Sequence, residues 1–181
     1  MTAAEFKALL ESLRSLPYGG EAVDQYQHAV QSAALAIAAG ADDDVVLAAA
    51  LHDIGRARTV AQRHPDVPHE ASGEQFVSEL IGERAGWLVG AHVAAKRYLV
   101  FSDAEYRDTL SPVSQRLLVQ QGEAFTKDEA DAFIAQPWAD QAVQLRRWDD
   151  LAKDPDARLL PLDDLIAVYE RHRSARSSAP S

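Results

Sequence analysis

Apolar residues recur along most of the chain at the spacing of a helix face, and alternating strand-like patterns are scarce. Phe6, Leu9, Leu10 and Leu13 mark such a face within residues 3–16, because positions three and four apart meet on one side of a helix. The same pattern predicts further helices over residues 24–39, 42–53, 69 onward, 83–95, 137–153 and 163–171. We therefore expect an all-α bundle.

Turn and capping residues divide these helices. Ser102-x-x-Glu105 and Thr126-x-x-Glu129 have the spacing of a capping box, and Ser111-Pro112 is typical of an N-cap followed by proline in the first turn. Residues 56–68 are polar, contain two prolines and are expected to form a loop. We expect one domain over residues 1–173 and a flexible tail over 174–181.

Composition limits the possible functions. The chain has 181 residues, which is enough for one substantial core. Its formal charge of −10 argues against nucleic-acid and anionic-membrane partners. No apolar run approaches a membrane span, and no signal peptide is evident, so we expect a cytoplasmic protein. The absence of cysteine excludes disulfides and thiolate metal sites.

The segment Leu51-His52-Asp53-Ile54-Gly55 carries the strongest chemical signal. An imidazole beside a carboxylate offers two good ligands for a metal ion, and the carboxylate can bridge two ions. The segment ends an apolar run, which places the pair inside the core. We therefore interpret it as a metal site.

Other candidate ligands are dispersed along the chain. His28 lies 24 residues before His52, while His69, His92 and Asp149 follow on or beside later helices. Taken singly, each is more typical of a hydrogen-bonded core residue or a solvated side chain. Helices that converge in a bundle can nevertheless assemble such residues into one metal site. His64 and His172 are expected to have no part in it.

The order of these residues resembles the HD-domain superfamily, and within it the oxygenases that cleave phosphonates at a mixed-valence di-iron site. Three groups of segments carry the likeness: Tyr18-Gly19-Gly20-Glu21 with Gln25 and His28; His69-Glu70 and His92-Val93-x-Ala95-Lys96-Arg97-Tyr98-Leu99; and Leu110-Ser111-Pro112-x-Ser114 with Arg146-Arg147-Trp148-Asp149-Asp150-Leu151. The resemblance spans nearly the full length and implies an HD-domain helical bundle.

By this resemblance, two iron ions, Fe(II) and Fe(III), are held by six residues, with dioxygen as co-substrate. One iron would take His28, His52, Asp53 and Asp149, and the other would take His69, His92 and the bridging Asp53. Asp150 is the alternative to Asp149, and only one of the two can face the site, because neighbours on a helix point about 100° apart.

The resemblance also implies which residues meet the substrate. Lys96, Ser114 and Arg146 would surround the phosphonate, Gln25 would contact the substrate, and Tyr18 and Glu21 would form a gate that contacts its amino end. The family's histidine after the tetrad is replaced here by Arg56. Because arginine is longer and always charged, we expect it to contact the phosphonate or an acidic substrate tail.

The predicted function is oxygen-dependent cleavage of the carbon–phosphorus bond of an α-hydroxyphosphonate, such as 2-amino-1-hydroxyethylphosphonate or a close relative, to a carboxylate and phosphate. A partner 2-oxoglutarate-dependent hydroxylase could supply that substrate. The alternative is an HD-type metal-dependent phosphohydrolase acting on a nucleotide or phosphate monoester. A degenerate HD domain that serves as a binding module is a third possibility, which the complete ligand set disfavours.

Overall fold

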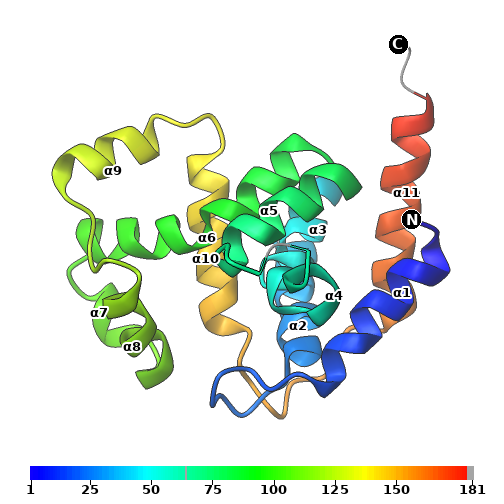
Figure 1. The fold of residues 1–181 in the computed structure, drawn as a ribbon, viewed down its shortest axis with the longest axis horizontal. Helices are drawn as coiled ribbons and strands as arrows, with labels where there is room; N and C mark the ends of the chain where they lie inside the picture. The colour runs from blue at the N-terminus through cyan, green and yellow to red at the C-terminus, as the bar shows by residue number, and fades with distance from the viewer. Residues whose placement is uncertain (64, 179–181) are drawn as a thin grey trace.

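The computed structural model describes residues 1–63 and 65–178, and these residues form a helical bundle (Figure 1). Within those ranges no β-strand occurs, and an isolated bridge joins Pro17 to Asp24. The all-α expectation is therefore confirmed. The elements are α1 Ala3–Ser12, η1 Leu13–Ser15, α2 Gln25–Ala38, α3 Asp43–Leu51, η2 Ile54–Arg56, α4 Arg58–Ala61, α5 His69–Leu80, α6 Glu83–Ser102, α7 Tyr106–Thr109, α8 Pro112–Gln120, α9 Lys127–Ile134, α10 Ala139–Leu151 and α11 Leu162–Ser178.

Local signals in the sequence set the ends of the two helices that carry the first candidate ligands. Asp24 caps α2 by accepting a hydrogen bond from the Gln27 amide, and Asp42 caps α3 in the same way. Gly40 separates the two helices with a φ of +72°, a conformation that glycine adopts without strain. The expected starts of both helices are confirmed, whereas α3 ends at Leu51, two residues before its expected end.

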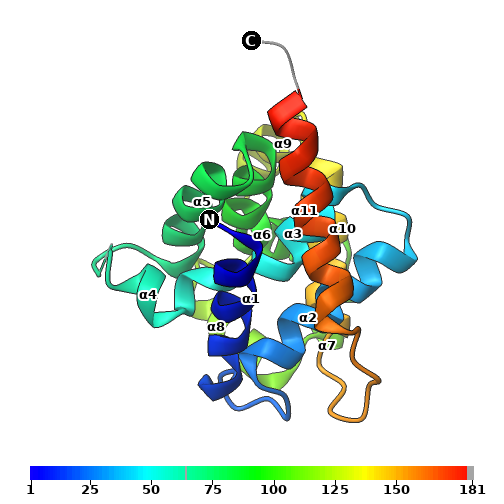
Figure 2. The same ribbon diagram turned by 90° about the vertical axis from the view of Figure 1, so that its right-hand side faces the viewer.

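Helices α2, α3, α5, α6 and α10 form the centre of the bundle. Helix α6 packs against α3, α5 and α10, and α2 packs against both α3 and α10. Figure 1 shows α7, α8 and α9 on one side of this centre and α1 and α11 on the other. In Figure 2 the helices nearest the two chain ends, α1 and α11, lie side by side, and they are in contact.

The main hydrophobic core runs through the whole bundle. It includes residues from Phe6 near the start to Tyr169 near the end, and these two rings stack with centroids 4.1 Å apart. A smaller cluster lies under α7 and α8. The core thus ties both ends of the chain to the helices that carry the candidate site.

The structure differs from the sequence-based expectation at three places. Residues 56–68 are not a plain loop, because Val60 is buried and anchors the short helix α4. Helix α6 runs seven residues past Ala95, since Leu99 continues its buried face. The predicted capping box at Ser102 does not form, because Ser102 is the last residue of α6.

The C-terminal segment is more regular than expected. Helix α11 continues to Ser178, so the first five residues of the expected tail are helical. Residues 179–181, the rest of that tail, and His64 lie outside the described residues. Among the helices that the structure describes, none has the combination of length and apolar character needed to cross a membrane.

A close backbone approach explains the glycine of the His-Asp-Ile-Gly segment. A Cβ atom on Gly55 would lie 1.9 Å from the His69 carbonyl oxygen and 2.7 Å from the Ser72 hydroxyl. Only glycine lets η2 come this near to the first turn of α5. This contact fixes the distance between the His52-Asp53 pair and His69.

We therefore expect Gly55→Ala to cost at least about 2 kcal/mol of unfolding free energy, because η2 and α5 must separate. Urea denaturation of the metal-free protein measures the change. Gly40→Ala is the matched control, since its Cβ meets no atom within 4 Å and only its φ is strained; it should cost about 1 kcal/mol. Equal losses in the two variants would contradict this explanation.

Candidate metal centre

Two groups of ligand atoms converge in the centre of the bundle. The first contains His28 from α2, His52 at the end of α3 and Asp53. The second contains the same Asp53 with His69, the first residue of α5, and His92 of α6. One carboxylate therefore belongs to both groups, which is the arrangement of two neighbouring metal positions.

Backbone and carboxylate acceptors fix the orientation of all four imidazole rings. The Nδ1 atoms of His28, His52 and His92 lie 2.8, 2.8 and 2.6 Å from the carbonyl oxygens of Ala152, Ala49 and Val89. The Nδ1 atom of His69 lies 2.9 Å from a carboxylate oxygen of Glu70. A carbonyl only accepts, so Nδ1 carries the proton and the Nε2 lone pair is left free for a metal.

The spacing of the free Nε2 atoms fits ligands that share an ion. His28 Nε2 and His52 Nε2 are 3.0 Å apart, and His69 Nε2 and His92 Nε2 are 3.3 Å apart. Two nitrogens at right angles on one ion, each about 2.1 Å from it, would be about 3.0 Å apart. With the proton on Nδ1 of both His28 and His52, no proton lies between their Nε2 atoms, so a cation is the natural partner of this pair. The donor set therefore fits a metal pair.

Asp149 faces the first ligand group and Asp150 does not. An Asp149 oxygen is 3.3 Å from His28 Nε2 and 3.8 Å from His52 Nε2. Asp150 instead accepts hydrogen bonds from Tyr106 and Arg146. The geometry favours the predicted Asp149 over its neighbour as a fourth ligand on this side.

Neighbouring charges keep both central carboxylates ionised. Burial would raise the pKa of Asp53, but Arg56 and the hydrogen bond from His69 outweigh it and hold that pKa well below its usual range. Burial also opposes ionisation of Asp149, where Arg146, His52 and His28 lower the pKa strongly. Both side chains are thus in the charged form that metal binding requires.

Two of the buried histidines, His52 and His92, are held neutral, which is also the metal-binding form. At His69 burial lowers the pKa, but hydrogen bonds with Asp53 and Glu70 outweigh it and raise that pKa. Burial, with the neighbouring His69 and His52 rings, lowers the pKa of His92 to about 3. Burial is also the main cause that lowers the pKa of His52. His172, predicted to lie outside the site, hydrogen-bonds the Ile81 carbonyl and pairs with Asp44 instead.

Arg56 lies directly on the second ligand group. Its Nε donates to Asp53 at 3.0 Å, and its Nη2 is 3.0 Å from His69 Nε2. The guanidinium therefore uses the same lone pairs that an ion between Asp53 and His69 would use. The side chain is 36% exposed, so it can turn outward when an ion takes its place.

A small inner cavity adjoins the two ligand groups. Its volume is about 20 Å³, which is room for about one water molecule. Besides four of the six candidate ligands and Val93, it is lined by Tyr18, Arg56, Lys96, Ser114, Leu117, Gln121 and Arg146, with His28 and His52 outside its wall. Lys96 is 2% exposed and makes no hydrogen bond or ion pair with any residue that the structure describes. Burial lowers its pKa to about 8.

A larger outer cavity of about 320 Å³ lies next to the inner one. It is lined by Pro17, Tyr18, Gly19, Glu21, Gln25, Arg56, Val113, Ser114 and Leu117. Tyr18, Arg56, Ser114 and Leu117 line both cavities and form the wall between them. All predicted substrate-binding residues therefore line one cavity or the other.

The turn that carries Tyr18 and Glu21 is closed at its base and tipped with glycine. The bridge between Pro17 and Asp24 pins its two ends, while Gly19 and Gly20 adopt φ values of +56° and +100°. The Tyr18 hydroxyl donates to Asp149 at 3.1 Å, and its ring stacks on His28 at 4.0 Å. Tyr18 thus covers the first ligand group.

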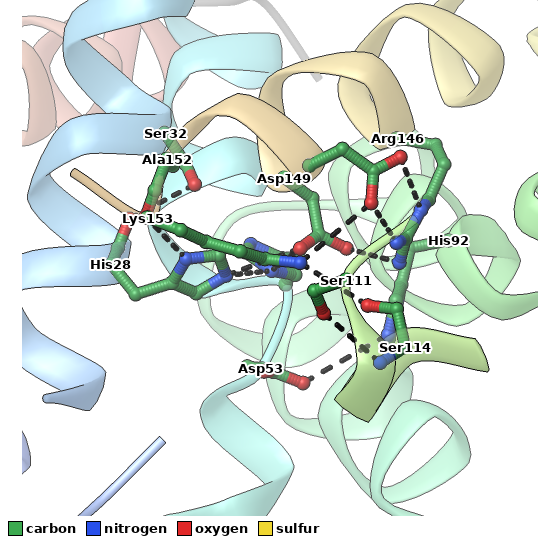
Figure 3. A network of polar contacts seen from close by, with 12 residues as sticks. His28, Ser32, Asp53, His92, Ser111, Ser114, Arg146, Asp149, Ala152 and Lys153 are labelled. Atoms are coloured by element: carbon green, nitrogen blue, oxygen red, sulfur yellow. Dashed lines mark hydrogen bonds and ion pairs between the residues drawn. The ribbon is translucent and has the colours of Figure 1, made fainter. Parts of the chain in front are cut away.

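Sequence reasoning missed two polar residues near the centre. Gln121 lines the inner cavity, and its side-chain oxygen is buried without a hydrogen-bond partner in the described part of the chain. Lys153 donates to Ser114 Oγ at 3.2 Å (Figure 3). Gln121 follows the predicted Ser114 by seven positions, or two helix turns, which was a weak signal for it. Lys153 lies beyond the end of α10, and helical spacing gave no signal for it.

A buried ligand set of histidines and aspartates in a helical bundle defines a metal-binding domain of the His-Asp type. The HD domain family model matches residues 26–135, which is more than half of the chain, and the chain belongs to this family. The match includes five of the six candidate ligands, all except Asp149.

Three similar proteins support this membership. A hydroxymethylphosphonate dioxygenase of Gimesia maris is 40% identical over 139 residues, which cover 74% of this chain and 69% of that protein. An uncharacterized protein of Acanthamoeba polyphaga mimivirus is 32% identical over 86% of this chain and 74% of its own length. A 1-hydroxy-2-(trimethylamino)ethylphosphonate dioxygenase of Leisingera caerulea is 31% identical over 77% and 74%.

The depressed pKa of His92 predicts how pH acts on the metal-free protein. A histidine titrates near 6.5 when unfolded and near 3 here. Its contribution to stability is therefore complete above pH 6.5 and is lost as the pH falls toward 3, by about 2 kcal/mol between pH 6.5 and 5. Urea denaturation across this range should show a smaller acid-induced loss in His92→Gln than in the parent protein. An identical loss in both would contradict the assignment.

Proposed function

We propose that this protein is an iron-dependent dioxygenase that cleaves the carbon–phosphorus bond of an α-hydroxyphosphonate. The observation that carries the proposal is Asp53, a single carboxylate shared by two histidine-containing ligand groups. A site built for two ions suits oxygen chemistry, whereas the single-ion phosphohydrolase alternative needs no second group. The similarity to two phosphonate dioxygenases supports the same reaction.

The metal pair would be held by His28, His52, Asp53, His69, His92 and Asp149. Bound there, two iron ions would supply the site that binds dioxygen and accepts electrons. In the overall reaction one α-hydroxyphosphonate and one dioxygen give one carboxylate and one phosphate. The carbon–phosphorus bond breaks, the substrate is oxidised, and both oxygen atoms of the reduced dioxygen end in the products.

The chain's own residues would bind and orient the substrate. Lys96 and Arg146 bring two buried cations to the inner cavity, and Ser114 adds a hydroxyl. Cations and hydroxyls are suited to a phosphonate dianion, since charged hydrogen bonds are strong in a buried site. Lys96 has no protein partner among the described residues, so a bound anion would satisfy it.

Tyr18 would act as the gate between the two cavities. The inner cavity is too small for a phosphonate, so Tyr18 must move from Asp149 before a substrate can approach the ligands. Gly19 and Gly20 give the turn the backbone freedom for that movement. Glu21 and Gln25 line the outer cavity, where the substituent on the reacting carbon would lie.

Several finer points stay predictions. They are the substrate 2-amino-1-hydroxyethylphosphonate or a close relative, the Fe(II)/Fe(III) state of the pair, the cytoplasmic location and the partner hydroxylase. A hydroxylase would fit because an α-hydroxyphosphonate is the product expected from hydroxylating a phosphonate next to phosphorus.

The decisive test measures metal content and oxygen dependence together. Protein reconstituted with ferrous iron should bind about two irons per chain, and a panel of hydroxyphosphonates should release phosphate under air but not under nitrogen. His69→Ala and His92→Ala should each lower the iron content toward one per chain, because both ligands belong to the second group. Phosphate release that is equally fast without oxygen would establish a hydrolase instead.

Replacing Lys96 should raise the stability of the protein while it lowers its activity. Its lowered pKa means that the folded protein holds a charged lysine at a cost below pH 8, and this cost disappears above about pH 10.5. We expect Lys96→Met to stabilise the substrate-free protein at pH 7 by about 2 kcal/mol and to lower kcat/KM at least a hundredfold. Thermal denaturation and phosphate release measure both effects.

The exposed Lys127 provides the control for that variant. Its side chain is 75% exposed and pairs with Asp131 on the outside of α9. Lys127→Met should leave both stability and turnover nearly unchanged. If Lys96→Met instead destabilised the protein and kept full activity, Lys96 would be a structural residue.

A further inference from the structure

The carboxylate that lines the outer cavity, Glu21, already interacts with other side chains of the protein. Glu21 is the acidic residue among the described lining residues. One of its oxygens accepts a hydrogen bond from the Ser111 hydroxyl at 2.5 Å and lies 3.8 Å from the Lys153 ammonium. Both partners of this ion pair are largely buried, with Glu21 15% and Lys153 12% exposed. The negative charge of Glu21 is thus neutralised before any ligand arrives.

Lys153 is well fixed beside the cavity. It donates to Ser114, lies 3.8 Å from Asp150 and sits over the Tyr18 ring at 5.8 Å. Figure 3 shows its side chain extending across the centre of the network toward Ser114. Asp150 is already engaged by Arg146 and Tyr106. Glu21 is therefore the partner whose charge Lys153 is free to cancel.

A second cation, Arg56, lines the outer cavity itself. Arg56 forms part of the wall shared with the inner cavity and is bound to Asp53 and His69 in the metal-free protein. Metal ions on those two residues would compete with the guanidinium and repel it, which leaves its charge facing the outer cavity. An ammonium group placed there would meet one cation and a carboxylate shared with another.

Resting on the proposed function, we infer that the outer cavity selects α-hydroxyphosphonates whose reacting carbon carries no positively charged substituent, and that Lys153 is the residue that sets this preference. Hydrogen, a neutral group or a carboxylate satisfies the cavity. An ammonium group would lose its hydration there without gaining a carboxylate of its own. Repulsion by the nearby cations would further disfavour the charged substrate relative to the neutral one. This inference replaces 2-amino-1-hydroxyethylphosphonate, the substrate expected from the sequence, with its close relative hydroxymethylphosphonate as the better substrate.

The test compares these two substrates by kcat/KM in the iron-loaded enzyme under air. We expect the parent protein to favour hydroxymethylphosphonate at least tenfold. Lys153→Met should reduce this ratio at least tenfold, mainly by improving the aminated substrate, because Glu21 is then free to pair with the ammonium. Lys153→Arg keeps the charge and should keep the ratio. Lys127→Met, at an exposed lysine, should also leave it unchanged.

A double variant distinguishes specificity from a structural effect. Adding Glu21→Gln to Lys153→Met removes the freed carboxylate and should restore most of the parent ratio. If Lys153→Met instead changes both substrates equally, Lys153 only supports Ser114 and its specificity role is wrong. A parent protein that uses the aminated substrate as well as the hydroxymethyl one overturns the selection but leaves the dioxygenase intact. Turnover of neither substrate, nor of others in the panel, overturns the proposed function itself.

Discussion

The hydrogen bonds that hold the imidazole rings are the constraint on which the centre of this protein depends. His52 and His92 each bond, through Nδ1, to the carbonyl three residues earlier in the chain. His28 bonds across to Ala152, just past the end of α10. These carbonyls fix the direction of three rings, and the Glu70 carboxylate fixes that of His69. Four Nε2 atoms therefore converge although they come from four different helices. The packing of helices α2, α3, α5 and α6 keeps these nitrogen atoms close together.

Around those nitrogens the protein buries charges that few stable cores contain. Asp53, Asp149, Lys96 and Arg146 are all at most 8% exposed. The carboxylates are paired with cations, and Lys96 is not paired within the described residues. Burying such groups is unfavourable compared with apolar packing. The arrangement is understandable as one that is completed by ions and by an anionic ligand, with stability given up at the place where chemistry occurs.

Local sequence patterns predict most helices of the bundle, but they predict the candidate metal centre less directly. Helical periodicity and the Thr126 capping box predicted what formed, and the predicted helix starts coincide with the N-caps Asp24 and Asp42. The Ser102 box failed because α6 continues through Ser102 and ends there, and α4 was missed because Val60 alone anchors it. Motif resemblance identified the residues around the two cavities, but it could not reveal Gln121 or Lys153. Their roles depend on which partners tertiary packing brings near, and no spacing rule contains that information.

The narrow chamber above the ligand groups has a consequence for a catalyst that handles oxygen. A reactive metal centre that is open to solvent would reduce dioxygen without product whenever the organic substrate is absent. Here a single aromatic ring, seated on His28 and tethered to Asp149, leaves space for little more than one water. Under the proposed function, entry of the substrate would displace that ring. The substrate-free protein would then limit idle oxidation through one residue on a glycine-tipped turn.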